Sequence, residues 1–246
     1  MIYDTKLPQF FPEIKKLNTI SKQNLLNDSL LLEREGDLAM YYAPHNEWIN
    51  KEAKIFIVGI TPGWSQMEAA YKQLRQSMER DEPMEKMLEQ AKMAASFSGT
   101  MRKNLTAMLD EIGLADALHI DTAATLFTTH RSYLHTTSVI KYPVFLKGKN
   151  YTGHTPSIDK SAMLKRYAHH FFPKELGMIT TPTLVIPLGK ATENVIRKVQ
   201  IDTHTYLFGF PHPSGANGHR EKQFHQNRTE LHKAIQKWKQ KSEPNK

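Results

Sequence analysis

A short apolar run followed at once by glycine and proline constrains this chain more than any other stretch. Residues 54–64 read KIFIVGITPGW, in which the apolar residues 55–58 precede Gly59. A run of this length bounded by glycine is typical of a buried parallel strand rather than of a helix. Pro62 and Gly63 then turn the chain, and in an open α/β sheet such a turn lies at the carboxyl end of a strand, where ligands bind. Because an ordinary turn has the same pattern, this stretch alone does not indicate a function.

Strand-like and helix-like segments alternate along the rest of the chain. Further strands are expected at residues 133–137, 183–186 and 205–208, which are short and rich in β-branched or aromatic residues. This alternation predicts an α/β fold, a three-layer α/β/α sandwich with a central, mainly parallel four-stranded sheet, as a single domain over residues 1–246. The expected helices cover residues 13–35, 67–80, 85–95, 100–112, 161–172, 192–199 and 220–239. A further short helix is expected to begin with Asp121 as its N-cap and to end at Phe127. The tail over residues 241–246 is expected to fray.

Composition excludes several kinds of site. Lys and Arg number 33 against 25 Asp and Glu, a formal charge of +8, which favours a polyanionic partner such as DNA, with a basic solvated surface as the alternative. The absence of cysteine excludes disulfides, thiolate nucleophiles and iron–sulfur clusters. No signal peptide or long apolar span is present, so we expect a cytoplasmic protein without a membrane partner. The histidines (His169, His170, His219 and His225 among them) have no carboxylate or cysteine at ligand spacing, so no metal or other cofactor is expected.

A second informative stretch lies near the carboxyl end. Residues 210–217 read FPHPSGAN, directly after the last expected strand, and place His212 between two prolines. Proline fixes the backbone on both sides, so the loop holds His212 at the sheet edge that also carries the turn at residues 59–63. A G-x-x-P-G-type loop after the first core strand and an H-P-S loop near the carboxyl terminus resemble the uracil-DNA glycosylase superfamily.

Shorter matches lie in order between these two loops. Residues 95–114 resemble the P-F-x-G…M-L…I-G-L segment of the thermostable bacterial branch, although that branch's cluster cysteines are absent here. T-S-V-I-K at residues 137–141 is similar to T-N-x-x-K, and P-L-G-K-A at residues 187–191 is similar to the family's strand followed by L-G-x-x-A. Together the matches span residues 54–217, most of the chain.

The resemblance implies a monomeric, monofunctional DNA glycosylase that hydrolyses the N-glycosidic bond of a flipped pyrimidine and leaves an abasic site. Phe97 occupies the family's stacking position, and His212 would donate a hydrogen bond to the departing base. Without the matching context, Phe97 reads as a core residue and His212 as a loop residue. The implied base-binding residues are Ile60, Pro62, Gly63, Trp64, Phe97, Ser138, Asn150 and Tyr151, and the implied DNA contacts are Lys141 (as a phosphate contact, not a nucleophile), Ser214, Gly215, Ala216, Asn217 and Arg220.

Three positions depart from the family pattern. Thr61 stands where relatives carry Asp or Asn to activate water, and a hydroxyl can only orient a water. Ser138 replaces the Asn that reads the uracil edge; a rival register places Asp121 at that position, but the match on both sides favours Ser138. Gly63 replaces a bulky ring that blocks the 5-position, so space remains there unless Trp64 or the loop with Asn150 fills it.

These departures favour a pyrimidine with a large 5-substituent, such as the hypermodified cytosine that some superfamily members remove from phage DNA as a defence. The polar loop at residues 147–154 offers groups suited to a sugar, although a solvated loop has the same composition. The alternative substrate is uracil in DNA repair. The alternative of another class is a non-catalytic binder of DNA or modified bases, which Thr61 favours.

Overall fold

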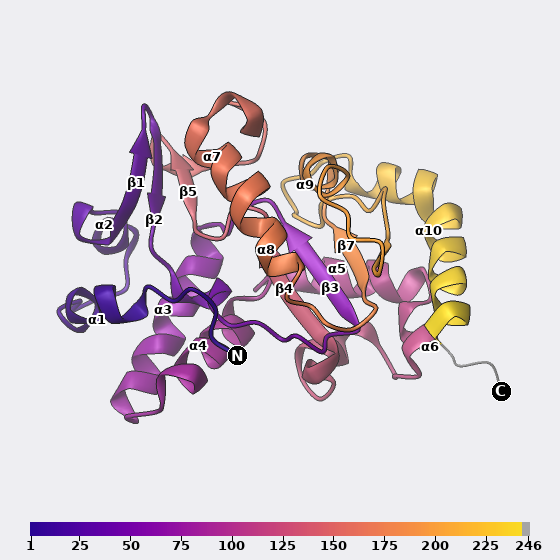
Figure 1. Cartoon of the computed structure of the whole chain (residues 1–246), viewed down its shortest axis with the longest axis horizontal. Helices are drawn as coiled ribbons and strands as arrows, with labels where there is room; N and C mark the ends of the chain where they lie inside the picture. The colour runs from indigo at the N-terminus through magenta and orange to yellow at the C-terminus, as the bar shows by residue number, and fades with distance from the viewer. Residues whose placement is uncertain (243–246) are drawn as a thin grey trace. The chain divides into compact units, whose positions relative to one another are not determined.

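The computed structural model describes residues 1–242 and falls into two compact units, each built from separate stretches of the chain (Figure 1). Unit 1 comprises Met1–Ile49, Ile60–Ser98 and Thr137–Glu175. Unit 2 comprises Asn50–Gly59, Gly99–Thr136 and Leu176–Lys246. Because the stretches alternate, no single boundary in the sequence separates the units. The single domain over residues 1–246 stays a prediction, and of the tail predicted to fray, residues 243–246 lie outside the described part.

Unit 2 contains the predicted parallel sheet. Its strand order is β4 (Leu134–Ser138), β3 (Ile55–Gly59), β7 (Leu184–Pro187) and β8 (Thr205–Tyr206), and the last two residues of β4 belong to unit 1. Strand β7 pairs in parallel with both β3 and β8. Every residue of β3 and β7 is buried, as expected for central strands covered on both faces. The α/β class and the four-stranded sheet flanked by helices are confirmed.

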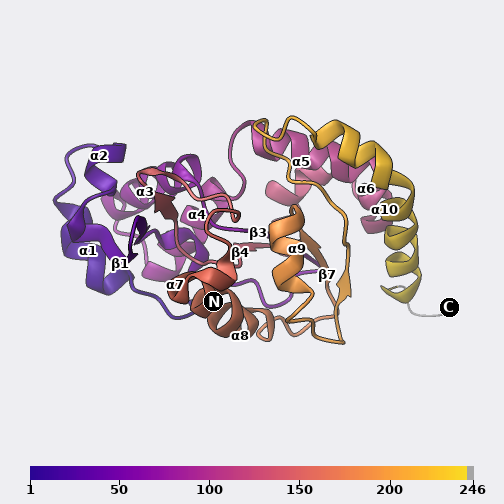
Figure 2. The same cartoon turned by 90° about the horizontal axis from the view of Figure 1, so that it is seen from above.

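The helices of unit 2 are α5 (Thr100–Glu111), α6 (Leu114–Leu118), α9 (Lys190–Ile196) and α10 (Arg220–Ser242). Helix α10 packs along α6 (Figure 2). The prediction that Asp121 caps the short helix after α6 is wrong by one residue. Thr122 caps the 3-10 helix Ala123–Phe127, and Asp110 accepts hydrogen bonds from the Thr122 hydroxyl and the Ala123 amide, which leaves Asp121 exposed.

Unit 1 contains a second sheet that the sequence did not predict. It is antiparallel, in the order β1 (Leu31–Glu35), β2 (Leu38–Tyr41), β5 (Val144–Leu146) and β6 (Lys149–Asn150). The helix predicted over residues 13–35 is therefore wrong. It is replaced by α1 (Leu7–Lys15), α2 (Lys22–Leu25) and β1. Pairing of β1 with β2 overrides the helical spacing of the leucines, since a strand satisfies its backbone groups through its neighbour.

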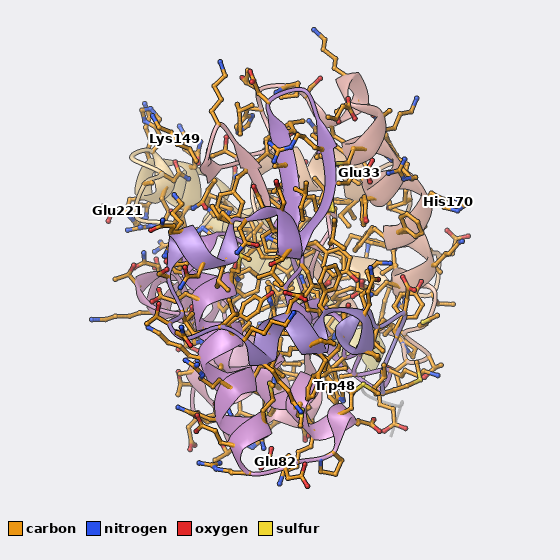
Figure 3. All side chains as sticks on the ribbon, turned by 90° about the vertical axis from the view of Figure 1, so that its left-hand side faces the viewer. Glu33, Trp48, Glu82, Lys149, His170 and Glu221 are labelled. Carbon is orange, nitrogen blue, oxygen red and sulfur yellow. The ribbon has the colours of Figure 1, made fainter. Side chains whose placement is uncertain are left out.

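The remaining helices of unit 1 are α3 (Trp64–Glu79), α4 (Met84–Ala95), α7 (Ala162–Arg166), a π-helical turn (Tyr167–Phe171) and α8 (Phe172–Leu176), whose last residue belongs to unit 2. Helices α3 and α4 pack against each other. Arg166 pairs with Glu33 of β1, which lies beside α7, and His170 lies at the outer edge of the same helical segment (Figure 3). No helix within residues 1–242 has both the length and the apolar run needed to cross a bilayer.

A buried carboxylate organises the interior of unit 1. Glu47 is fully buried, and its oxygens accept hydrogen bonds from the hydroxyls of Thr5, Tyr42 and Tyr142 at 2.6, 3.0 and 2.8 Å and from the Lys6 amide at 2.9 Å. Burial raises the pKa of Glu47, and the charge of Lys141 opposes that rise. The network ties the first residues of the chain to β2 and to the stretch after β4. It thereby fixes the backbone against which the loop after β3 lies.

Candidate active site

The loop that leaves β3 is held by hydrogen bonds within unit 1. The Ile60 carbonyl accepts from the Ile140 amide at 3.0 Å. The Thr61 hydroxyl donates to the Tyr142 carbonyl at 2.9 Å and accepts from the Val144 amide at 3.2 Å. A hydroxyl has one proton and two lone pairs, so one lone pair of Thr61 remains for a water. This geometry limits Thr61 to accepting one hydrogen bond from a water.

The space beside Gly63 is filled by Asn150. The Asn150 Oδ1 accepts from the Trp64 amide at 3.0 Å. A Cβ at residue 63 would lie 3.2 Å from the Asn150 Nδ2, closer than ordinary contact, so a residue larger than glycine would push the amide aside. Asn150, in one of the two segments expected to fill this space, is thus in contact with Gly63, and its part in a base pocket stays a prediction. Pro62, which precedes Gly63, is buried.

The predicted role of Tyr151 does not fit its position. Tyr151 is buried, its hydroxyl donates to the Pro156 carbonyl at 2.6 Å, and its amide donates to the Val144 carbonyl. Burial raises the pKa of this phenol to about 12. Because both its ring and its hydroxyl are already occupied inside unit 1, Tyr151 supports Asn150 rather than contacting a base.

Phe97 lies just after α4 in a strained conformation. Its side chain is buried, and its φ of 48° is in the left-handed region, which is rare for a bulky residue and is found preferentially at functional sites. The Ser98 amide donates to the Ala95 carbonyl at 3.1 Å, which closes the turn around the ring. The stacking role that the resemblance implies stays a prediction, because a buried ring also fits the core residue expected without the matching context.

Ser138 and Lys141 lie close together in sequence at and just after the end of β4, and they differ in that the Lys141 ammonium group is already hydrogen-bonded. Ser138 lines a cavity of unit 1. Lys141 is buried, and its Nζ donates to the carbonyls of Tyr3 and Asp4 at 2.9 and 3.2 Å. The phosphate contact predicted for Lys141 is therefore wrong, because its ammonium group anchors the N-terminal segment instead. The rival Asp121 belongs to unit 2, whereas Ser138 belongs to unit 1.

In unit 2 the His212 loop crosses the carboxyl end of β7. The Gly189 amide donates to the Phe210 carbonyl at 2.9 Å, and a Cβ at Gly189 would lie 3.0 Å from the Cβ of His212. Gly189 has a φ of 80°, so glycine suits both its backbone conformation and the close approach of the loop. The Asn104 side chain donates to the Pro213 carbonyl at 2.9 Å. The loop is thus fixed on both sides of His212.

His212 is held as a neutral ring with a defined tautomer. Its Nδ1 accepts a hydrogen bond from the Ser214 amide at 3.3 Å, so the proton of the neutral ring is on Nε2. Burial lowers the pKa of His212 below its usual value, because the charged form loses hydration. A neutral imidazole whose Nε2 carries a proton is a hydrogen-bond donor without a net charge.

Hydrogen bonds hold the loop beyond His212. The Ser214 hydroxyl accepts from the Ala216 amide at 3.2 Å, and the Asn217 side chain donates to the His212 carbonyl at 3.2 Å. Gly215 and Ala216 are exposed. Arg220, the first residue of α10, donates to the Ser214 carbonyl at 3.5 Å. Asn217 and Arg220 therefore shape the loop, while its small tip residues face solvent.

Comparison with known proteins decides the family. The family model for the uracil DNA glycosylase superfamily matches residues 47–239. The chain belongs to this superfamily. It is also 50% identical over 222 residues to the uncharacterised protein YoxB of Bacillus subtilis strain 168, a match that covers 89% of this chain and 87% of that protein. No solved structure matches the chain. Members of the superfamily act on DNA, and membership implies DNA glycosylase activity.

The structure of this superfamily member also reveals residues that sequence reasoning missed. The cavity at Ser138 is lined in part by Tyr3, Tyr167 and Glu175. No spacing rule connects the N-terminal segment with the helical segment at residues 167–175, so nothing in the sequence indicated the group. Among residues 1–242, no cluster of three or more His, Cys, Asp or Glu side chains could hold a metal ion.

The tautomer of His212 predicts the pH dependence of glycosylase activity. The pKa of His212 is lower in the folded protein than in the unfolded chain, where it is about 6.5. The stability that the neutral His212 ring contributes is therefore complete above pH 6.5 and is lost as the pH falls through the folded-state pKa. Protonation would also place a proton on Nδ1, against the Ser214 amide. We therefore expect the single-turnover rate to stay level from pH 8 to below pH 6.5 and to fall at lower pH. A stopped-time assay across this pH range measures the single-turnover rate. If the rate falls with a midpoint at or above pH 6.5, His212 does not act as a neutral donor with a lowered pKa.

Proposed function

We propose that this glycosylase is monofunctional and that it releases a flipped pyrimidine, preferably a 5-substituted cytosine, from DNA by hydrolysis. The observation that carries this proposal is His212, a neutral donor fixed by the Ser214 amide and by close contact with Gly189. Breaking an N-glycosidic bond leaves negative charge on the departing base. A prepositioned donor stabilises that charge without reorganisation.

Phe97 and Thr61 have separate roles in the proposed reaction beside His212. By the family resemblance, the ring of Phe97 stacks on the flipped base, while the Nε2–H of His212 donates a hydrogen bond to the pyrimidine O2. The electron pair of the N-glycosidic bond leaves with the base as the bond breaks, and that hydrogen bond stabilises the resulting anion. A water, one of whose hydrogen bonds Thr61 accepts, then adds to the sugar carbon and gives up a proton to the departed base anion. Lys141 cannot act as an amine nucleophile because its Nζ is buried and bound to the carbonyls of Tyr3 and Asp4. This favours hydrolysis over a covalent lyase reaction at that position.

Two replacements support a modified cytosine as the substrate. Ser138 lacks the paired donor and acceptor with which an Asn side chain reads uracil. Beside Gly63, the amide of Asn150 takes the place of an aromatic ring. An amide offers hydrogen bonds to a hydroxyl on the 5-substituent, whereas a ring would exclude that substituent. Removal of such bases suits defence against phages that modify their DNA.

Two other functions each have one observation in their favour. Uracil release in DNA repair is favoured by His212, since the same donor serves any pyrimidine O2. A non-catalytic binder of modified bases is favoured by the Thr61 hydroxyl, whose proton already binds the Tyr142 carbonyl.

One assay separates the three functions. The protein is incubated with duplexes that contain a single uracil, 5-hydroxymethylcytosine or glucosylated 5-hydroxymethylcytosine, and abasic sites are then cleaved by alkali. We expect release from the modified cytosines to exceed release of uracil by at least about 10-fold, the discrimination that a single pocket contact provides. Release of uracil alone would establish a repair enzyme. Binding of all duplexes without abasic sites would establish a binder.

A further inference from the structure

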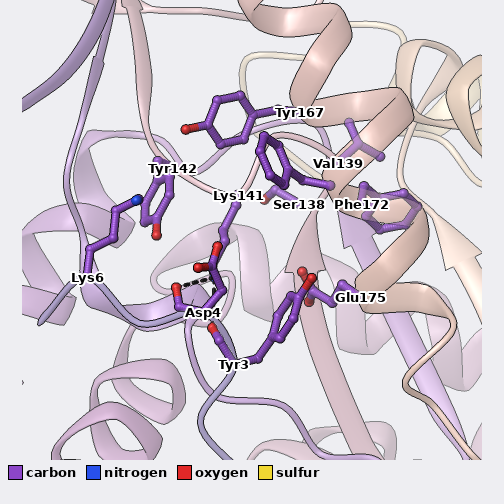
Figure 4. A pocket seen from close by; sticks show the side chains of 11 residues that line it. Tyr3, Asp4, Lys6, Ser138, Val139, Lys141, Tyr142, Tyr167, Phe172 and Glu175 are labelled. Atoms are coloured by element: carbon purple, nitrogen blue, oxygen red, sulfur yellow. Dashed lines mark hydrogen bonds between the residues drawn. The ribbon is translucent and has the colours of Figure 1, made fainter.

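A cavity of about 160 Å³ lies inside unit 1 next to Ser138 (Figure 4). Its walls come from the N-terminal residues 3–6, from residues 138–142 and from the helical segment 167–175. Because about 10–15 Å³ of this kind of volume is enough for one water, the cavity has room for a ligand several times larger than a water. The mechanism proposed above uses only Ser138 of this lining.

Aromatic rings form most of the apolar wall. Figure 4 shows the rings of Tyr3, Tyr142, Tyr167 and Phe172 arranged around the side chains in the middle of the cavity. Tyr142 and Phe172 are buried, whereas Tyr3 and Tyr167 are partly exposed. Flat rings with a few polar groups between them are the usual lining of a small-molecule site. They suit a ligand with an apolar face and polar edges.

The charges around the cavity are balanced. Lys6 and Lys141 contribute two ammonium groups, and Asp4 and Glu175 contribute two carboxylates. The Lys141 ammonium is already bound to two carbonyls, and Glu175 is buried. A phosphate or carboxylate ligand would meet these carboxylates with no surplus of positive charge to offset them. A neutral ligand rich in hydroxyl groups, which both donate and accept, matches this lining better.

Ser138 connects the cavity with the base. It occupies the family's base-reading position and also lines the cavity, and its side chain is shorter than the Asn it replaces. The loop at residues 147–154 is the other candidate for a sugar contact, but Tyr151 is buried and the Oδ1 of Asn150 is bound to the Trp64 amide, which leaves only the Asn150 Nδ2 for a single hydroxyl of the substituent. We propose that the cavity beside Ser138 binds a neutral hexosyl group carried by the modified cytosine. This inference rests on the function proposed above.

Variants of two lining residues test the proposal. Val139→Phe would fill the cavity, and Tyr167→Ala would remove one of its rings. The matched control is Tyr133→Ala, which removes a partly exposed tyrosine of unit 2 that is outside the cavity lining. Single-turnover rates are measured on duplexes with glucosylated 5-hydroxymethylcytosine and with 5-hydroxymethylcytosine, and the readout is the ratio of the two rates. Thermal unfolding reports whether each variant is folded.

We expect the ratio to fall at least about 30-fold in Val139→Phe and about 10-fold in Tyr167→Ala, with no change in Tyr133→Ala. An unchanged ratio in folded variants overturns the proposal, since the hexose then binds elsewhere. Val139 is buried, so if thermal unfolding shows that its variant does not fold, Tyr167→Ala decides. Wild-type release of uracil alone overturns this proposal but leaves a glycosylase. Release from no duplex overturns the proposed function as well.

Discussion

Replacing His212 by alanine should lower the single-turnover rate of base release by about 10²-fold or more, the loss typical of removing one fixed donor from a developing anion. DNA affinity stays within a few-fold, because the exposed tip of the loop is Gly215 and Ala216. The physical reason is the orientation of the ring: the Nδ1 of His212 accepts a hydrogen bond from the Ser214 amide, so Nε2–H can donate a hydrogen bond to the leaving base. Rapid-quench measurement with enzyme in excess isolates the chemical step.

The matched control for this prediction is His225→Ala, which removes an exposed histidine of α10. It should leave the rate unchanged. If His212→Ala and His225→Ala release the base equally fast, His212 has no part in the reaction and another donor must be sought. Equal losses of rate and of DNA affinity in His212→Ala would instead show that the loop has collapsed.

Replacing Glu47 by alanine should lower the free energy of unfolding by about 3–5 kcal/mol, the cost of breaking a buried charged network at one partner. The fully buried carboxylate accepts hydrogen bonds from Thr5, Tyr42 and Tyr142. Its loss leaves those donors unsatisfied and removes the negative charge that faces Lys141. Equilibrium unfolding in urea, followed by circular dichroism, measures the change.

Glu13→Ala provides the comparison for Glu47. Glu13 pairs with Lys16 on the surface of α1, and exposed pairs of this kind contribute about 1 kcal/mol or less. A loss in Glu47→Ala as small as that in Glu13→Ala would mean that water replaces the carboxylate in the interior of unit 1. The network would then be incidental to the position of the N-terminal segment.

The parts of the fold that could be predicted are those with strong local signals. The run at residues 55–58 is apolar on both faces and is bounded by glycine, and it is strand β3. The H-P-S loop could be located because prolines and the preceding strand restrict it locally. The helix predicted over residues 13–35 is absent because leucine spacing alone does not show whether a neighbouring strand is available, and β2 is that neighbour of β1.

The roles of site residues are harder to predict than their positions. The sequence could locate Lys141 and Tyr151 but not their hydrogen-bond partners. The Lys141 ammonium binds the Tyr3 and Asp4 carbonyls and the Tyr151 hydroxyl binds the Pro156 carbonyl, and tertiary structure sets both arrangements. A motif gives the type of side chain and not the direction in which it points. The contact of Asn150 with the Trp64 amide beside Gly63 could be foreseen only as one of two possibilities.

The interleaved stretches of the two units have a consequence for synthesis on the ribosome. Strand β3 is made early, but β7, with which it pairs in parallel, begins only at Leu184. At typical elongation rates the delay is on the order of ten seconds. Strand β4, its neighbour on the other side, is complete at Ser138, but throughout the delay the edge of β3 that faces β7 stays unpaired, and unpaired strand edges promote aggregation. We therefore expect the yield of the nascent protein to depend on chaperones that bind the chain before residue 184 has been synthesised.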